Sequence, residues 1–301
     1  VATVPPQPIR AARSLRTGLT PYLLLAPALV ALAAVSLYPL FYGVRASTTR
    51  YRYGRERGFN GLDNYRRIWD DHTFWDAMLT TLKFVVVAVS IETVLGLLLA
   101  LLVNRELRLP GLFRVAILLP MTIAPIVVGI VWRLIYASDI GIVNPLFGAV
   151  GLDEPNVLAQ TGSAFLGLVV VDVWEWTPLV FLIIFAGLQG LPQEPIEAAR
   201  VDGAGTLRVF FDHVLPLLRP VLLVAIVLRS IDAIGTFDQI FVLTKGGPGT
   251  ATQLIAYYSY NTGFLFSEYG QAAAMVIALL LVVLALGLLA IRLMRRAEAV
   301  A

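Results

Sequence analysis

Cysteine is absent from this 301-residue sequence, and histidine occurs only at positions 72 and 213. Without cysteine the chain can form no disulfide, bind no zinc through thiolates and use no thiol nucleophile. Charge is scarce as well, because only 14% of the residues are charged, whereas an ordinary globular domain has about a quarter. These shortages exclude a disulfide-stapled secreted domain, predict no metal site, and argue against a soluble or nucleic-acid-binding protein.

Apolar residues are what the sequence has in excess, at 58% of the chain with a mean hydropathy of +0.80. A bilayer core about 30 Å thick requires ~20 mainly apolar residues per spanning helix, and six stretches reach that length. Inside lipid the backbone must satisfy its own hydrogen bonds, so each stretch is expected to be helical. We therefore predict an all-α integral membrane protein with six transmembrane helices and a membrane domain over residues 21–294. The helices cover about residues 21–43, 84–103, 113–136 (interrupted by Pro120 and Pro125), 164–188, 217–243 and 271–292.

Basic residues beside the spans predict the orientation, since short loops rich in lysine and arginine stay in the cytoplasm. Twelve arginines lie in the two tails and in the second and fourth loops: Arg10, Arg13, Arg16, Arg105, Arg108, Arg114, Arg200, Arg208, Arg219, Arg292, Arg295 and Arg296. The N-terminal tail (1–20) and the C-terminal tail (295–301) are therefore predicted to be cytoplasmic. One loop opposes this orientation, because seven arginines lie between Arg45 and Arg67 on the predicted outer side.

Ionisable residues inside the spans are the first functional signal. Each costs at least ~2.5 to 3.5 kcal/mol to insert, so such groups normally face the bundle interior or a wet cavity. Glu92 is one of them, on the second span. Residues three or four apart share a helix face, which defines one polar stripe on the fourth span and another on the fifth. The stripes are Asp172, Glu175, Trp176 and Leu179, and Arg229, Asp232, Ala233 and Thr236. Two such faces on consecutive spans predict a shared cavity.

The side chains of these stripes suit one solute class best. Carboxylates beside Trp174 and Trp176 supply hydrogen-bond acceptors for hydroxyl groups and flat apolar faces for a sugar ring. A pocket for a neutral polyhydroxylated solute is therefore predicted. Two other interpretations stay open: the charges neutralise each other or tie helices together, or Asp172, Glu175 and Asp232 relay protons.

The fourth loop, residues 190–216, contains the most specific pattern in the chain. It reads Glu-Ala-Ala-Arg-Val-Asp-Gly-Ala from Glu197 and ends in Leu-Pro at residues 215–216. Local preferences predict a short helix through residues 197–201, a turn at Asp202 and Gly203, which tolerate unusual dihedral angles, and a second helix from about Thr206. Small residues on such a surface helix indicate that something packs closely against it.

This loop resembles the EAA loop of ABC importer membrane subunits. The family pattern is EAA, three residues, Gly, nine residues, a branched apolar residue, one residue, then Leu-Pro, and only His213 departs from it, at the branched apolar position. Residues 59–84, 191–205 and 237–252 also resemble the sugar-permease branch, which includes the maltose and multiple-sugar systems. The resemblance covers about residues 20–295.

The resemblance implies a type I ABC importer permease fold and a set of partners in a prokaryotic plasma membrane. These are a second homologous permease, expected to form a heterodimer with this chain, two ABC ATPase subunits and an extracytoplasmic substrate-binding protein. ATP and Mg would be used by the ATPase subunits, so this chain would be a transport subunit rather than an enzyme and would bind no cofactor. The residues implied in ATPase coupling are Glu197, Ala198, Ala199, Asp202, Gly203 and Ala204.

The same resemblance, aligned without gaps on Pro178, Glu197 and Pro216, places the family's sugar contacts on the eight stripe residues. The solute could be a sugar, another polyol or glycerol phosphate, and the second permease could make the contacts instead. A stand-alone proton-coupled carrier and an intramembrane enzyme are the alternatives of other classes. The sequence shows neither an evident inverted repeat nor a nucleophile with its base, and the two lysines, Lys83 and Lys245, lie in no phosphate-binding loop.

Overall fold

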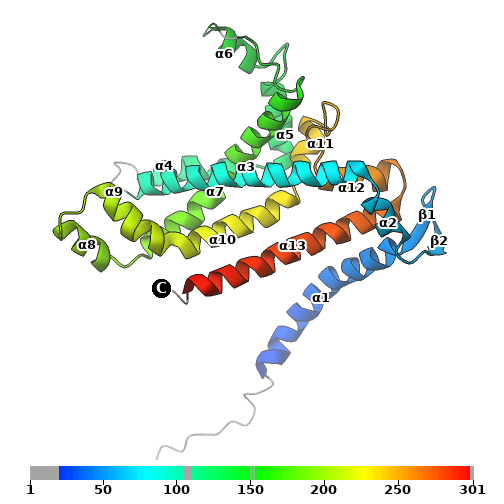
Figure 1. The fold of residues 1–301 in the computed structure, drawn as a ribbon, viewed down its shortest axis with the longest axis horizontal. Helices are drawn as coiled ribbons and strands as arrows, with labels where there is room; N and C mark the ends of the chain where they lie inside the picture. Colours follow the sequence, from blue (N-terminus) through cyan, green and yellow to red (C-terminus); the bar gives the residue numbers. More distant parts are fainter. Residues whose placement is uncertain (1–19, 105–109, 150, 152, 299–301) are drawn as a thin grey trace, which may run out of the picture. The chain divides into compact units, whose positions relative to one another are not determined.

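A computed structural model describes residues 20–104, 110–149, 151 and 153–298 (Figure 1). The chain divides into two units, residues 1–45 and 46–301. The described part of the first unit belongs to the helix α1 (Thr20–Ser47), which is apolar enough to cross a membrane from Tyr22 onward. Most of the predicted N-terminal tail, the arginines at 105 and 108, and the last three residues of the predicted C-terminal tail lie outside the described residues.

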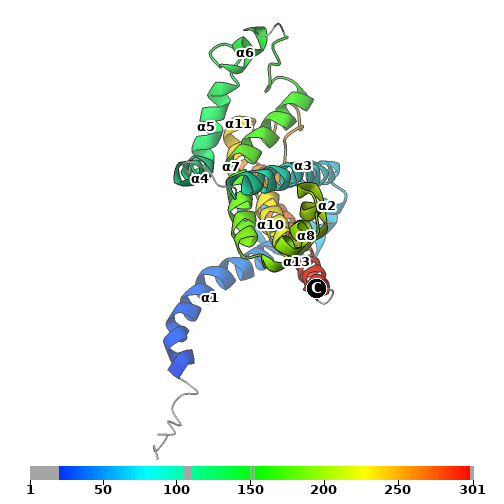
Figure 2. The same ribbon diagram turned by 90° about the vertical axis from the view of Figure 1, so that its left-hand side faces the viewer.

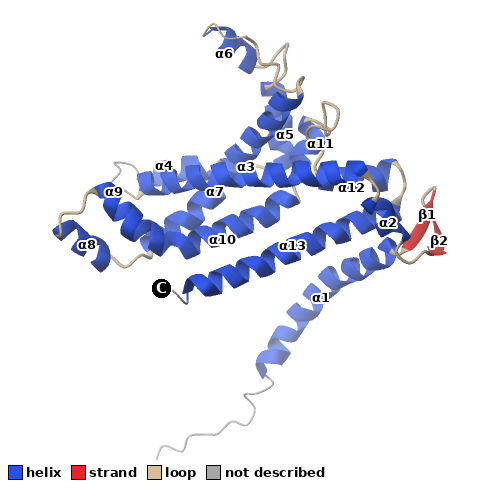
Figure 3. Cartoon of the chain, viewed as in Figure 1, coloured by secondary structure: helices blue, strands red, loops and turns tan. Residues whose placement is uncertain are grey.

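The second unit opens with a β-hairpin of β1 (Thr49–Arg52) and antiparallel β2 (Arg55–Phe59), followed by α2 (Asp63–Trp69). Figure 3 shows the hairpin in red among the helices. Its two-residue turn, Tyr53-Gly54, has positive φ at both residues, 52° and 73°, as the turns that match strand twist require. The fold is therefore not purely α-helical. Residues 49–59 carry a period-two alternation and a turn glycine, which favour strands over a helix.

Four long helices form the body of the second unit (Figure 1 and Figure 2). They are α3 (His72–Val103), α7 (Thr161–Gln189), α10 (Leu215–Ile234) and α13 (Tyr269–Glu298). Helix α3 packs along α7, and α10 contacts α3, α7 and α13. A β-carbon added at Gly96 of α3 would lie 2.9 Å from Val180 Cγ1 of α7, so the absent side chain is what lets these helices approach closely.

The third predicted span is broken where its prolines lie. Residues 113–136 do not form one helix but parts of α4 (Pro110–Leu118), the 3₁₀ turn η1 (Pro120–Thr122) and α5 (Pro125–Ile135). Proline lacks the amide hydrogen that continues a helix, and its ring clashes with the preceding turn. The short helix α6 (Val143–Ala149) follows.

The fifth predicted span ends earlier than expected. Its helix is preceded by α8 (Glu194–Val201), α9 (Thr206–Val209) and the π-helical turn η2 (Phe210–Val214), and it stops at Ile234 instead of reaching residue 243. Gly235, with φ of −87°, is the C-cap residue, and glycine disfavours continuation of a helix because it loses more backbone freedom than other residues. The chain then forms α11 (Asp238–Leu243), which packs on α5. The helix α12 (Ile255–Tyr260) and the π-helical turn η3 (Asn261–Leu265) lead into α13.

Five described helices are long and apolar enough to cross a membrane: residues Tyr22–Ser47, His72–Val103, Thr161–Gln189, Thr206–Ile234 and Tyr269–Leu289. Helix α5 is apolar but only 11 residues long. The chain is thus a mostly helical, multi-pass membrane protein. Six spans with both termini in the cytoplasm stay a prediction, in which the broken segment α4–η1–α5 would supply the third span.

Candidate functional site

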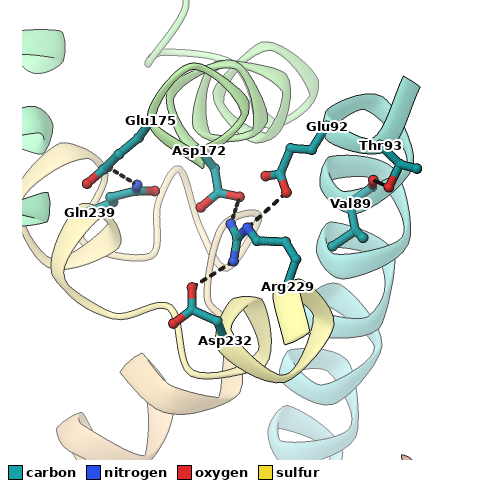
Figure 4. Close-up of polar contacts among 8 residues, drawn as sticks. All are labelled: Val89, Glu92, Thr93, Asp172, Glu175, Arg229, Asp232 and Gln239. Atoms are coloured by element: carbon teal, nitrogen blue, oxygen red, sulfur yellow. Dashed lines mark hydrogen bonds and ion pairs between the residues drawn. The ribbon is translucent and has the colours of Figure 1, made fainter. Parts of the chain in front are cut away.

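Arg229 of α10 is fully buried and faces carboxylates from three helices. Its Nε atom lies 2.8 Å from Oε2 of Glu92 on α3, and its Nη2 donates to Oδ2 of Asp172 on α7. Its Nη1 donates to Oδ2 of Asp232, one turn further along α10, at 2.9 Å. Figure 4 shows the guanidinium between the three acids. Arg229 therefore joins α3, α7 and α10 at one point.

The charges of this cluster explain why it forms in apolar helices. A guanidinium buried without partners would be very costly, whereas its fixed fork of donors can satisfy several carboxylates at once. The ring of Trp176 adds a cation-π contact, with its centroid 5.1 Å from Cζ of Arg229. One arginine faces three acidic side chains, so acids outnumber the cation in this cluster.

A second buried contact holds α11 in place. Nε2 of Gln239 donates to Oε2 of Glu175 on α7 at 2.6 Å, and both side chains are buried. This bond joins residues that are 64 positions apart. It fixes the segment that follows the helix break at Gly235 against the middle of α7.

A cavity of about 120 Å³ lies beside these two contacts. It is lined by Pro125, Trp176, Asp232, Gly235, Thr236, Phe237, Asp238 and Gln239. The side chain of Asp232 is 52% exposed although one of its oxygens binds Arg229, so its carboxylate can still accept hydrogen bonds from a solute. The cavity thus combines acidic acceptors with the indole of Trp176, a combination suited to hydroxyl groups on an apolar ring.

The structure divides the eight predicted solute contacts into three groups. Trp176, Asp232 and Thr236 line the cavity. Asp172, Glu175 and Arg229 lie in the buried contacts behind it. Leu179 and Ala233 are not among the lining residues, and Ala233 is fully buried in the apolar core.

Sequence reasoning missed two residues of this site. Glu92 stood out as an intramembrane charge, but nothing in the sequence placed it opposite Arg229, 137 positions away by residue number. Gln239 lies beyond the helix break, where the three-to-four spacing that defined the fifth-span stripe no longer applies. Its neutral amide gave no charge signal either.

The loop between α7 and α10 forms the helical hairpin that the sequence predicted, with α8 and α9 joined by a turn. Gly203 has φ of +82°, a conformation that other residues adopt at a cost. The exposed predicted coupling residues are Glu197, Ala198, Asp202 and Gly203, whereas Ala204 is half-buried. Ala199 is buried against Ile196 and Val209.

Two further features distinguish this hairpin. Val201 and Leu207 are 87% and 74% exposed, which is a large apolar exposure for two residues so close in sequence. His213, the one departure from the family pattern, lies in the π-helical turn η2.

Within the described ranges, no group of three or more His, Cys, Asp or Glu side chains could hold a metal ion.

Comparison with known proteins adds to this geometry. Residues 92–299 match the family described as "Binding-protein-dependent transport system inner membrane component". Over 251 residues the chain is 42% identical to a probable ABC transporter permease protein, y4oQ, of Sinorhizobium fredii, covering 82% of this chain and 81% of the relative. It is 39% identical over 267 residues to the trehalose/maltose transport system permease protein MalF of Thermococcus litoralis, covering 87% and 89% of the two chains.

A solved structure shares the fold. One chain of a bacterial ABC transporter involved in the import of the acidic polysaccharide alginate superposes with a TM-score of 0.80, covering 91% of this chain and 94% of that one. The sequence identity is 22%, so this likeness concerns the fold alone.

Proposed function

The chain belongs to the family of binding-protein-dependent transport system inner membrane components, and we propose that it forms half of the pore of an ATP-driven importer for a sugar or related polyhydroxylated solute. The pore would lie in the plasma membrane of a prokaryote. A second, homologous permease would complete it, and an extracytoplasmic binding protein would deliver the solute. The broken segment α4–η1–α5 would complete six spans of the type I importer fold, with both termini in the cytoplasm.

The main support for a sugar as the solute is that the indole of Trp176 and the half-exposed carboxylate of Asp232 line the same cavity. Sugars present hydroxyl donors around a ring with apolar faces, and a carboxylate and an indole match these two features. The trehalose/maltose permease among the relatives supports the same class. The excess of carboxylates around Arg229 disfavours an anionic solute such as glycerol phosphate, because the guanidinium already faces three acids.

The buried acids are poorly arranged for a proton relay, which is the main alternative mechanism. Asp172 is held by Arg229, and Glu175 is held by the amide of Gln239, which carries no titratable proton. An arginine stays protonated in proteins, so the cluster offers a fixed cation in place of a proton carrier. The polar residues therefore fit a binding and positioning role.

The hairpin of α8 and α9 would couple this chain to the ATPase subunits, which would hold and hydrolyse ATP with Mg. Glu197, Ala198, Asp202 and Gly203 are exposed and so available to a partner, and Ala199 and Ala204 would hold the two short helices together from within. Val201 and Leu207 add exposed apolar surface on the same hairpin. A rigid hairpin of this kind can transmit the closure of two ATPase subunits to α7 and α10, the helices that carry the cavity.

The test uses the importer assembled from this chain, its partner permease, its two ATPase subunits and its binding protein in lipid vesicles. Uptake and stimulation of ATP hydrolysis are measured with trehalose, maltose and sn-glycerol 3-phosphate. We expect Trp176→Leu to raise the half-saturation concentration for the sugar about tenfold, by loss of the aromatic contact. The matched control is Trp174→Leu, because Trp174 packs edge-on against Trp132, with centroids 5.7 Å apart, and does not line the cavity.

The results separate the candidate functions. A tenfold effect for Trp176→Leu with less than a twofold effect for Trp174→Leu supports the proposed site. Equal effects of the two variants would show that this cavity does not bind the solute. Stimulation by sn-glycerol 3-phosphate alone would establish the anionic substrate instead, and uptake that persists without the ATPase subunits would establish a secondary carrier.

A further inference from the structure

The β-hairpin of the second unit carries four arginines on one face. Side chains alternate between the two faces of a strand, so Arg50 and Arg52 of β1 share a face. Arg52 pairs directly with Arg55 of β2, and Tyr51 pairs with Glu56. Alternation along β2 places Arg57 on the same face as Arg55, and the register shift between Thr49 and Tyr51 sets Arg57 and Gly58 together opposite Arg50. The opposite face carries Tyr51, whose ring packs edge-on against Tyr269 with centroids 5.7 Å apart.

This arrangement is unfavourable for the isolated chain. Like charges directly opposite each other on a strand pair are destabilising, and Arg52 and Arg55 are such a pair. All four arginines are exposed. The acid of the hairpin, Glu56, pairs with Tyr51 across the strands and so lies on the opposite face from Arg52 and Arg55. The repulsion is therefore best offset by an anionic surface outside the chain.

The position of the hairpin along the chain identifies that surface. Its first strand begins two residues after the candidate span that ends at Ser47, and Tyr269, which Tyr51 contacts, begins another candidate span. Asn64 of α2 donates to the backbone carbonyls of Ser47 and Thr49 at 2.9 and 3.0 Å. The hairpin is therefore fixed at the level where apolar helices end, which is the level of the lipid headgroups.

Exposed aromatic rings accompany the arginines, as expected at a membrane interface. Tyr53 at the hairpin turn and Phe59 at the end of β2 are 83% and 82% exposed, and Trp69 of α2 is 70% exposed. Aromatic side chains collect at the boundary between membrane and water, while arginine binds phosphate through its planar fork of donors.

We propose that the hairpin binds the phosphate groups of anionic phospholipids through Arg50, Arg52, Arg55 and Arg57. The contact would anchor the end of α1 at Ser47 and the start of α13 at Tyr269 to one leaflet. It accounts for the one arginine-rich loop that opposes the orientation predicted from the other loops. Arginines bound to headgroup phosphates at the outer surface serve an interfacial role, so their number there need not indicate a cytoplasmic loop.

The test measures binding of a fluorescent phosphatidylglycerol to the purified full-length chain in a neutral detergent, with fluorescent phosphatidylcholine as the reference probe. Replacing all four arginines by glutamine is expected to raise the dissociation constant for phosphatidylglycerol at least about tenfold, because each arginine near an anionic surface contributes. Replacing all four by lysine keeps the charge and is expected to change it less than about threefold. Raising the salt concentration should weaken binding to the unaltered chain and leave the glutamine variant little changed.

Two controls make the result specific. Arg50→Gln/Arg52→Gln is compared with Arg219→Gln/Arg292→Gln, a pair of exposed arginines on α10 and α13 that removes the same charge. Equal losses in the two pairs would overturn the proposal, since affinity would then follow net charge alone. Size-exclusion chromatography checks that each variant folds, which is expected because the substitutions relieve repulsion on an exposed face.

An acidic protein partner is the competing occupant. If the glutamine variant keeps its affinity for phosphatidylglycerol but loses binding to a soluble component of the assembled importer, the hairpin is a protein-docking surface and the lipid proposal is wrong. Either result leaves the proposed transport function untouched, because that function is tested at the cavity and the coupling hairpin.

Discussion

Nε of Arg229 on α10 lies 2.8 Å from Oε2 of Glu92 on α3, and both side chains are fully buried. Two further carboxylates, those of Asp172 and Asp232, complete the surroundings of the same guanidinium. Each of the three acids is therefore partly redundant, whereas the arginine is not. This asymmetry governs how the protein should respond to substitutions in the cluster.

Arg229→Met is expected to destabilise the protein more than Glu92→Gln. Removing one partner of a buried ion pair costs about 3–5 kcal/mol. In Glu92→Gln the guanidinium keeps two carboxylates, so the destabilisation is expected at the lower end of this range. Arg229→Met leaves Glu92 and Asp172 buried without a cation, so its destabilisation is expected at the upper end. The measurement is the thermal unfolding midpoint of each purified variant in detergent.

A double variant tests the pairing itself. Arg229→Met leaves two buried acids without a cation, and adding Glu92→Gln removes one of them. The double variant should therefore be more stable than Arg229→Met alone. If the two destabilisations simply add, the two side chains are not energetically coupled and the ion pair makes no contribution.

Asp232→Asn should impair solute affinity and spare the fold. Its carboxylate is half exposed in the cavity, and hydrogen bonds to charged groups contribute about 1.5–3 kcal/mol, so a rise of about tenfold or more in the half-saturation concentration is expected. Asp172→Asn, which alters a fully buried partner of the same guanidinium, should instead lower the unfolding midpoint. A lower midpoint for Asp232→Asn with unchanged transport would show that Asp232 is structural.

Gly203→Val should uncouple transport from ATP hydrolysis, and Gly203→Asn shows whether the turn or a contact with an ATPase subunit is responsible. Gly203 has φ of +82° and open space around its α-carbon, so a side chain there meets backbone strain in this chain but no clash. Asparagine tolerates such dihedral angles and valine does not. If only the turn matters, Gly203→Asn retains most solute-stimulated ATP hydrolysis, and if an ATPase subunit packs on the glycine, Asn and Val both abolish it.

The control for these variants is Gly205→Ala. Gly205 has an ordinary φ of −66° and open space beside it, so this substitution is expected to leave ATP hydrolysis stimulated by solute within about twofold. An equal loss in Gly205→Ala would point to a general sensitivity of the hairpin and would contradict a specific role for Gly203.

Gly96→Ala should weaken the packing of α3 on α7. The new methyl group would lie 2.9 Å from Val180 Cγ1 and 3.0 Å from the backbone nitrogen of Phe181, and backbone cannot move aside cheaply. Overpacking of this kind costs about 1–3 kcal/mol. Gly162→Ala, near the start of α7 with open space beside it, is the matched control and should be neutral or stabilising by up to about 1 kcal/mol. The thermal midpoints in detergent decide between these outcomes, and equal midpoints would refute the close contact.

The coupling hairpin shows how far local sequence reasoning reaches. The helix ending at Val201, the turn at Gly203 and the helix beginning at Thr206 were all predicted and all occur, because each depends on residues a few positions away. The interruption of the third span at Pro120 and Pro125 was also predicted and occurs, because proline acts on its own helical turn. The stop at Ile234 was missed because the apolar character of the sequence continues through α11 although the helix does not.

The sequence by itself determined that this chain enters a membrane, that charged residues lie in its apolar helices and that a helical hairpin joins α7 to α10, because composition, spacing and turn chemistry are local properties. Only the tertiary structure decided which charges meet. Arg229 and Asp172 are 57 positions apart, and Gln239 and Glu175 are 64 apart, so neither helix periodicity nor charge counting could pair them. The physical reason is that a buried ionic group needs its partners within about 3 Å, and that distance is set by how α3, α7 and α10 pack side by side.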